Sequence, residues 1–242
     1  MNIPAEFDEI RPYAPEELPQ VFEELIADPM FKAVVGQVMP GIPFDMIAAQ
    51  MRQCKTNLDF QKAFFYRLLK DLVQKCAKGL VFDCSAIKDK SINYTFISNH
   101  RDIVLDSALL SVVLIENGMN TVEIAIGDNL LIYPWIKKIV RINKSFIVKR
   151  GLGLREQLKS SMLMSSYMHY AISQKHENIW IAQRQGRAKD SNDRTQDSIL
   201  KMMVMGGEGD IFDRLKEMHL VPLSLSYEFD PCDYLKAKEA QQ

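Results

Sequence analysis

From about residue 94 onward, short β-like runs alternate with helix-like runs, and this alternation restricts the fold more than any other feature of the chain. The β-like runs cover residues 94–98, 121–126, 145–148, 179–182 and 221–227. The helix-like runs cover residues 106–116, 131–139, 155–173, 196–205 and 211–218. Strands that alternate with helices are typical of an α/β sheet with helices on both faces. We therefore expect an α/β fold with a mixed, largely parallel sheet flanked by helices.

The N-terminal part of the chain has a different pattern. Its apolar residues recur at helical spacing, for example at Phe64, Leu68 and Leu72. This periodicity predicts an N-terminal helical region over residues 1–88, followed by an α/β domain over residues 89–242. We find no internal repeat and no low-complexity segment in either part.

The composition excludes several classes of protein. The chain has 242 residues, 47% hydrophobic and 25% charged, which is an ordinary globular balance. Its formal net charge of -1 gives no basic footprint for nucleic acid. The N-terminus lacks an apolar signal core, and no apolar run reaches the roughly 18 to 20 residues that span a bilayer. We therefore expect a cytoplasmic protein, with a peripheral contact to the inner face of a membrane as an option.

Four cysteines are scattered along the chain: Cys54, Cys76, Cys84 and Cys232. Their spacing does not match that of common metal sites, so we expect free thiols in a reducing compartment and no bound metal.

His100 stands just after the first β-like run, and Asp106 lies near the start of the helix that follows. A neutral imidazole can take a proton from a hydroxyl group, and a carboxylate on its other nitrogen fixes the tautomer. Strand ends in α/β sheets are also where ligands bind. Asp102 is a second possible partner, although it also suits a turn or a helix N-cap. The structural alternative is that His100 caps the helix or fills a polar gap.

Cations follow two later β-like runs. Lys149 and Arg150 come directly after the third run, and Gly186 stands between cations after the fourth, with Arg187 and Lys189 on its C-terminal side. Arginine and lysine supply charge-assisted donors, and a glycine turn can hold a phosphate, so both segments suit an anionic ligand. The alternatives are a solvated charge pair and an exposed basic loop.

Taken in order, these segments resemble the conserved blocks of the glycerol-phosphate acyltransferase superfamily. Its members acylate glycerol 3-phosphate, lysophosphatidate or dihydroxyacetone phosphate. The resemblance extends over residues 98–227. The first block, a histidine and an aspartate separated by four residues, corresponds to the segment around His100. The later segments that carry the resemblance are residues 127–130, 146–150, 185–187 and 221–227. Residues 127–130 resemble a stretch found in the glycerol-3-phosphate and dihydroxyacetone-phosphate branch.

The resemblance implies a role for each candidate site residue. His100 is the base that deprotonates the acceptor hydroxyl, and Asp106 is its partner. The residues implied in binding the acceptor and its phosphate are Lys149, Arg150, Gln185, Gly186, Arg187 and Lys189. The fourth block lines the acyl pocket. No cofactor is implied, because acyl-CoA or acyl-carrier-protein is the donor substrate, and the acceptor hydroxyl attacks the thioester directly. Such an enzyme belongs to phospholipid biosynthesis.

The chain departs from the pattern at three positions. Five residues separate His100 from Asp106 instead of four, Gln185 replaces a glutamate, and Lys144 or Ser145 replaces a glycine. An amide still accepts a hydrogen bond from a hydroxyl, but it lacks the charge. Two alternatives therefore stay open. The chain could be a weakened or inactive lipid- or thioester-binding relative, or its acceptor could be a phosphate-free lyso-aminolipid.

The sequence bears on two further functions. Residues 130–141 are amphipathic, with Tyr133, Trp135 and three cations, and could lie on an anionic membrane surface or pack as an ordinary helix. A hydrolase ranks last, because the chain lacks the Gly-x-Ser-x-Gly turn of such enzymes.

Overall fold

The structure is a computed structural model that describes residues 3–189 and 192–241. Five strands form one sheet in the order β3-β2-β4-β1-β5. Their bounds are β1 Thr95–Ser98, β2 Val122–Gly127, β3 Ser145–Val148, β4 Asn178–Ala182 and β5 Leu220–Leu223. The expected α/β class is confirmed, but the sheet is parallel throughout instead of mixed. A helix follows each of the first four strands and returns the chain to the same end of the sheet, as parallel pairing requires.

The described residues form two compact units. The first unit contains residues 3–7, 81–125, 151–189 and 192–241, and the second contains residues 8–80 and 126–150. Each unit therefore combines segments that are distant in the sequence, and each is described by itself below.

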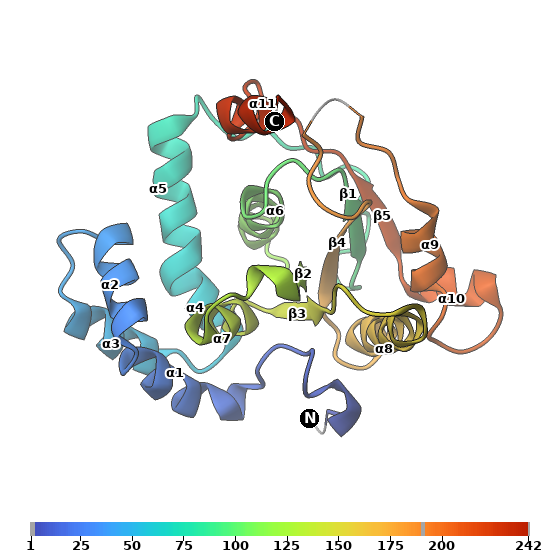
Figure 1. The fold of residues 1–242 in the computed structure, drawn as a ribbon, viewed down its shortest axis with the longest axis horizontal. Helices are drawn as coiled ribbons and strands as arrows, with labels where there is room; N and C mark the ends of the chain where they lie inside the picture. Colours follow the sequence, from blue (N-terminus) through green and yellow to red (C-terminus); the bar gives the residue numbers. More distant parts are fainter. Residues whose placement is uncertain (1–2, 190–191, 242) are drawn as a thin grey trace. The chain divides into compact units, whose positions relative to one another are not determined.

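Helices cover both faces of the strands in the first unit. The helices of this unit are α6 Leu105–Glu116, α8 Leu154–Ser173, α9 Asp197–Met203, α10 Ile211–Glu217, α11 Asp233–Ala240 and the short η1 Ala5–Phe7. Figure 1 shows α6 and α8 on opposite sides of β1 and β4. Phe96 and Trp180, which are register partners in β1 and β4, pack against Leu110 and Leu114 of α6. Four of these helices agree with the predicted runs, whereas α11 was not predicted.

The last strand is shorter than the sequence pattern suggests. The pattern predicts a strand over 221–227, but β5 ends at Leu223. Pro222 lies in this strand, where its missing N–H is tolerated because β5 is at the edge of the sheet. Residues 224–227 leave the sheet, and Tyr227 reaches Asp106 from there.

The N-terminal part of the chain is helical, as expected, and forms most of the second unit. The helical elements of this unit are η2 Pro15–Glu17, α1 Leu18–Ile26, α2 Pro29–Val38, α3 Phe44–Gln53, α4 Asn57–Phe60, the π-helix η3 Gln61–Tyr66, α5 Arg67–Cys76, η4 Asp128–Leu130 and α7 Pro134–Ile142. Asp28 caps α2 by accepting from the backbone N–H groups of Met30 and Phe31. The sequence pattern did not predict α3.

The apolar side of α7 faces the N-terminal helices. Ile142 is fully buried in the same core cluster as Leu18 and Phe22 of α1, and Trp135 and Ile139 pack against that cluster. Its amphipathic pattern is therefore explained by packing inside the second unit. Among the described helices, none has the length and apolar character needed to cross a membrane.

Candidate active site

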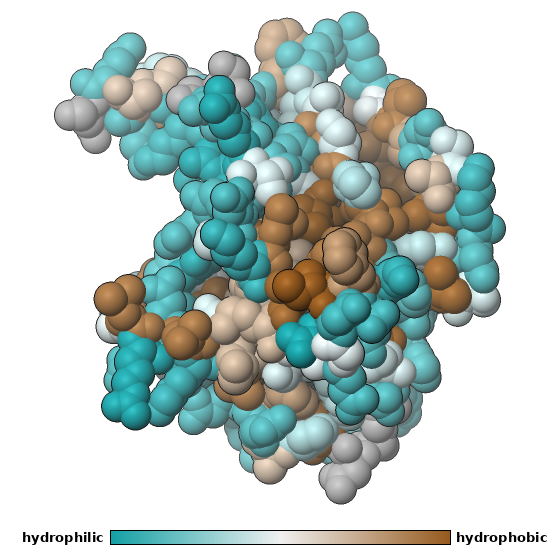
Figure 2. All heavy atoms as spheres, turned by 90° about the vertical axis from the view of Figure 1, so that its right-hand side faces the viewer, coloured by the Kyte–Doolittle hydropathy of each residue, from teal (hydrophilic) through white to brown (hydrophobic). Residues whose placement is uncertain are grey.

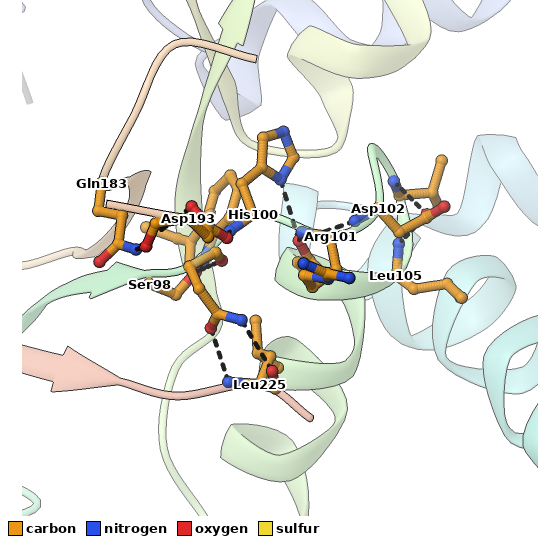
Figure 3. Close-up of polar contacts among 12 residues, drawn as sticks. Ser98, His100, Arg101, Asp102, Leu105, Gln183, Asp193 and Leu225 are labelled. Atoms are coloured by element: carbon orange, nitrogen blue, oxygen red, sulfur yellow. Dashed lines mark hydrogen bonds and ion pairs between the residues drawn. The ribbon is translucent and has the colours of Figure 1, made fainter. Parts of the chain in front are cut away.

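His100 and Asp106 are in direct contact. Nδ1 of His100 lies 2.9 Å from Oδ2 of Asp106 (Figure 3). The carboxyl group is fully buried, whereas the His100 side chain keeps 14% of its surface exposed. The ring of Trp180 packs edge-on against the imidazole at 5.6 Å between centroids. Because an ionised carboxylate only accepts, Nδ1 carries the proton of this hydrogen bond, and Nε2 has no partner among the described residues.

The loop before α6 accommodates the extra residue between His100 and Asp106. Asp106 lies in the first turn of α6, and its Oδ2 also accepts from the backbone N–H groups of Arg101 at 2.7 Å and Asp102 at 3.0 Å. The loop therefore wraps around the carboxylate, so that five intervening residues still allow the contact with His100.

Asp106 is held in its ionised form. Burial by itself raises the pKa of this carboxyl group. Hydrogen bonds from His100, from the Asp102 N–H, from Tyr227 and from the Arg101 N–H outweigh burial, so the net pKa lies below its ordinary value. An ionised Asp106 keeps the proton of His100 on Nδ1.

Asp102, the alternative partner, does not contact the imidazole. Its Oδ1 accepts from the backbone N–H groups of Val104 and Leu105, each at 2.9 Å. These two N–H groups belong to the turn that leads into α6. Asp102 therefore has the turn and N-cap role that the sequence also allowed.

Three polar side chains fix the His100 loop. Asp193 accepts from the backbone N–H of His100 at 2.9 Å, and Gln183 donates to the backbone oxygen of Asp193 at 2.8 Å. The Asn99 side chain forms two 2.8 Å hydrogen bonds with the backbone of Leu225 (Figure 3). Its Nδ2 donates to the Leu225 oxygen, and its Oδ1 accepts from the Leu225 N–H. Sequence reasoning missed the role of Asp193, because no local pattern links it to a residue 93 positions away.

Tyr227 is a second residue whose role sequence reasoning missed. Its hydroxyl group donates to Oδ1 of Asp106 at 2.8 Å. Burial, and then the neighbouring Asp106 carboxylate, raise the pKa of Tyr227, so the hydroxyl stays protonated and remains a donor. The sequence placed this tyrosine only in a core strand and in the segment implied to line the acyl pocket.

Removing the Tyr227 hydroxyl should destabilise the chain at neutral pH but not in acid. Tyr227→Phe removes a hydrogen bond to a charged group and is expected to cost about 1.5 kcal/mol. The lowered pKa of Asp106 stabilises the folded state above the unfolded value of about 3.9, and this stability is lost as pH falls through the folded pKa. The difference in unfolding free energy between the variant and wild type should therefore have its full value at neutral pH and shrink below about pH 4. Urea unfolding at neutral pH and below pH 4 measures this difference. An equal loss of stability under both conditions would contradict this role.

A salt-bridge cluster attaches the C-terminal helix to the same loop. Asp230 accepts from Nε of Arg101 at 2.9 Å and from Nζ of Lys236 at 2.5 Å, and Nζ also donates to the backbone oxygen of Arg101 at 2.7 Å. Lys236 is buried at 3% exposure. The first residue after His100 is thereby tied to α11, an element that the sequence pattern did not predict.

The segment after β4 adjoins the His100 loop through its backbone. The N–H of Ala188 donates to the backbone oxygen of His100 at 2.8 Å. Gly186 has a positive φ of 73°, which glycine adopts without strain. Gln185 is exposed, Arg187 is half-buried, and Lys189 forms an ion pair with Glu239 in α11. Three of the predicted ligand residues therefore lie on a turn next to His100, and Lys189 is engaged by α11.

Lys149 and Arg150 belong to the second unit. Nζ of Lys149 pairs with Glu9 at 2.6 Å, and the backbone N–H of Arg150 donates to Asp128 at 3.0 Å. Burial lowers the pKa of Arg150, and the Asp128 carboxylate acts in the opposite direction. A Cβ at Gly127 would lie 2.4 Å from Oδ1 of Asn129 and 3.4 Å from Nε of Arg150, so a larger residue there would require the Asn129 side chain to move. Within this unit, the Gly-Asp-Asn stretch and the cation after β3 therefore lie together.

The site around His100 is thus a buried carboxylate, an imidazole with a free nitrogen and a glycine turn. Among the described residues, no group of three or more histidine, cysteine or acidic side chains is arranged to hold a metal ion. Comparison of the chain with protein-family models gives no match, and comparison with curated proteins gives none.

Proposed function

We propose that the chain moves a fatty acyl group from an acyl thioester to a hydroxyl group of a glycerol phosphate or a lysophospholipid-type acceptor. The observation that carries this proposal is the His100–Asp106 hydrogen bond of 2.9 Å, which engages Nδ1 of the imidazole and leaves Nε2 without a partner among the described residues. The ordered sequence resemblance to the glycerol-phosphate acyltransferases supports the same conclusion. The donor is acyl-CoA or acyl-carrier-protein, and no cofactor takes part.

The reaction needs one base and no covalent enzyme intermediate. Nε2 of His100 takes the proton of the acceptor hydroxyl while the oxygen attacks the thioester carbonyl carbon. The tetrahedral intermediate then collapses, the C–S bond breaks, and the imidazolium returns the proton to the leaving sulfur. Asp106 stabilises the imidazolium between these two transfers. General-base assistance of this kind contributes about 10²–10⁴ in rate.

The glycine turn after β4 supports a phosphate-bearing acceptor. Arg187 follows Gly186 on this turn, which contacts the His100 backbone through Ala188. In the proposed complex, Arg187 binds the phosphate, and Gln185 accepts from a glycerol hydroxyl group. Lys189 adds a further positive charge beside the phosphate when its ion pair with Glu239 opens. Lys149 and Arg150 lie in the second unit, and their proposed role in phosphate binding rests on the sequence resemblance alone.

Exposed apolar side chains of the first unit supply a surface for the acyl chain. Figure 2 shows apolar residues gathered on the face that carries α9 and α10. The large exposed apolar residues of α8, α9 and α10 are Leu154, Leu158, Met162, Leu200, Ile211 and Phe212. The turn and α9 are joined by the backbone N–H of Gln185, which donates to the side chain of Gln196 at 2.8 Å. In this proposal, the acyl chain lies along these helices while its thioester is at His100.

An acceptor panel tests the proposal. Purified chain is incubated with acyl-CoA or acyl-carrier-protein and with glycerol 3-phosphate, lysophosphatidate or a phosphate-free lyso-aminolipid, and thiol release is followed. We expect release that depends on one of the two phosphate-bearing acceptors and yields an ester. Release that requires the lyso-aminolipid would transfer the activity to the alternative acceptor.

Gln185 motivates a second candidate, a lipid- or thioester-binding relative with little or no catalysis. Its side chain is exposed and neutral at the position where the resemblance implies a glutamate. The same panel separates the two candidates. Saturable binding of acyl-CoA or lysophosphatidate without thiol release from any donor would establish the binding function.

A further inference from the structure

The C-terminal helix α11 is held to the first unit by charged groups instead of by apolar packing. Lys236 is the one buried residue among residues 233–240, all of which the structure describes. The large apolar side chains in and just before the helix are exposed, namely Phe229, Tyr234 and Leu235. A helix of eight residues is marginally stable by itself. The ion pairs of α11 therefore decide where it lies.

Lys236 anchors α11 beside the loop that carries His100. Its Nζ donates to the backbone oxygen of Arg101 at 2.7 Å and to the Asp230 carboxylate at 2.5 Å. Loss of one partner of a buried ion pair is costly, so this attachment is the firm one. Glu239 follows Lys236 by three residues in the same helix and is therefore held at a fixed place near this loop.

The Glu239 carboxylate lies against the cations of the glycine turn after β4. Nζ of Lys189 donates to its Oε1. The pKa of the Glu239 carboxyl group lies below its ordinary value, because of this hydrogen bond first and also because of the charge on Arg187. Arg187 and Lys189 are the two cations of this turn that the proposed reaction assigns to the acceptor phosphate. A carboxylate of α11 and the phosphate would therefore compete for the same cations.

The charges of the two anions determine the outcome of this competition. A phosphate monoester carries about −1.5 to −2 charges at pH 7, whereas a carboxylate carries one. The side chains of Lys189 and Glu239 are both 48% exposed, and exposed ion pairs of this kind are weak. A bound phosphate can therefore displace the carboxylate. Because α11 is anchored at Lys236, the displaced group stays nearby at a high effective concentration and lowers the apparent affinity for phosphate.

We propose that Glu239 is an autoinhibitory group, which α11 holds on Arg187 and Lys189 and which the acceptor phosphate must displace. The inference rests on the proposed function, because it takes the acceptor to be a phosphate ester. A free phosphate ion has the same chemistry and would displace the carboxylate in the same way. The anchored helix thus sets the acceptor concentration at which the site opens.

Titration calorimetry on the full chain with glycerol 3-phosphate and with inorganic phosphate tests the proposal. Glu239→Gln keeps a good helix former but removes the charge, so it should bind glycerol 3-phosphate about two- to fivefold more tightly than wild type. Glu208→Gln is the matched control, because it removes the same charge from an exposed position between α9 and α10, and it should bind like wild type. Arg187→Gln should weaken binding by about tenfold or more, which locates the phosphate on the turn.

Hydrogen exchange of the α11 backbone provides a second measurement that needs no turnover. With millisecond labelling, saturating glycerol 3-phosphate should accelerate exchange in α11 of wild type, because the helix loses its contact with Lys189. In Glu239→Gln, exchange should already be fast without ligand and should not change when glycerol 3-phosphate binds.

The outcomes separate this inference from the proposed function. Wild-type affinity in Glu239→Gln would overturn the inference, as would bound glycerol 3-phosphate that leaves α11 exchange unchanged, or binding of neither probe by either protein. Tighter binding of glycerol 3-phosphate than of inorganic phosphate assigns the displacement to the acceptor, and equal affinities assign it to the free ion. Displacement of Glu239 without thiol release from any acyl donor would reject the acyl transfer but retain the autoinhibitory contact.

Discussion

Replacement of Asp106 by asparagine is expected to lower acyl-thioester turnover by about 10²–10⁴-fold, close to the full value of the general base. In wild type, Oδ2 of Asp106 accepts from Nδ1 of His100 and from two backbone N–H groups. An asparagine has only one oxygen and cannot serve both the donors on Oδ2 and the Tyr227 hydroxyl on Oδ1. The amide nitrogen then faces a donor, and the imidazole loses the carboxylate that fixes its tautomer.

Asp102→Asn is the matched control for this prediction. Asp102 accepts only backbone N–H groups at the start of α6, and asparagine performs the same capping role. Thiol release by the two variants is compared with wild type at equal folded fraction, as measured by circular dichroism. We expect a loss of less than about threefold for Asp102→Asn, since Asn and Asp are nearly equivalent caps. Equal losses of thiol release in both variants would show that turnover depends on the structure of the loop and not on the carboxylate that contacts the imidazole.

The largest expected effect on stability comes from the buried pair of Glu123 and Lys175. Glu123 is fully buried in β2, where Lys175 donates to its Oε1 and the hydroxyl of Tyr167 donates to its Oε2 at 2.6 Å. Lys175→Met leaves this carboxylate without its cation. Loss of one partner of a buried ion pair costs about 3–5 kcal/mol of unfolding free energy.

Two further variants make the stability prediction specific. Lys159→Met replaces an exposed lysine of α8 and should change the free energy of unfolding by less than about 0.5 kcal/mol. Adding Glu123→Gln to Lys175→Met removes the unpaired charge and keeps an acceptor for Tyr167, so most of the lost stability should return. Urea unfolding provides the values. A Lys175→Met variant as stable as wild type would mean that Glu123 does not depend on this lysine.

The fold could be predicted in outline because its dominant signals are local. The alternation of apolar strands with amphipathic helices is visible within windows of about ten residues. It predicts the α/β class and five of the six α-helices that the structure describes after β1. The direction of strand pairing was only partly predicted. Parallel pairing of β5 with β1 depends on residues more than 120 positions apart, and periodicity does not report such contacts. Helices α3 and α11 were missed, and the periodic apolar signal of α11 is weak.

The candidate site was predictable where its residues are close in sequence. His100 and Asp106 lie six positions apart at one strand-to-helix loop, so the sequence alone predicts their pairing. Asp193 and Tyr227 approach the same loop from 93 and 121 positions away. Their roles depend on how β4 and β5 bring the chain back beside β1. The early end of β5 was decisive for Tyr227, because a strand continued to residue 227 would have kept this side chain in the sheet.

The most direct test of the account measures thiol release from acyl-CoA with and without glycerol 3-phosphate, in wild type and in His100→Ala. The account predicts acceptor-dependent release by wild type and a loss of about 10²–10⁴-fold in a variant that stays folded. Wild-type turnover in folded His100→Ala would contradict the assignment of His100 as the base.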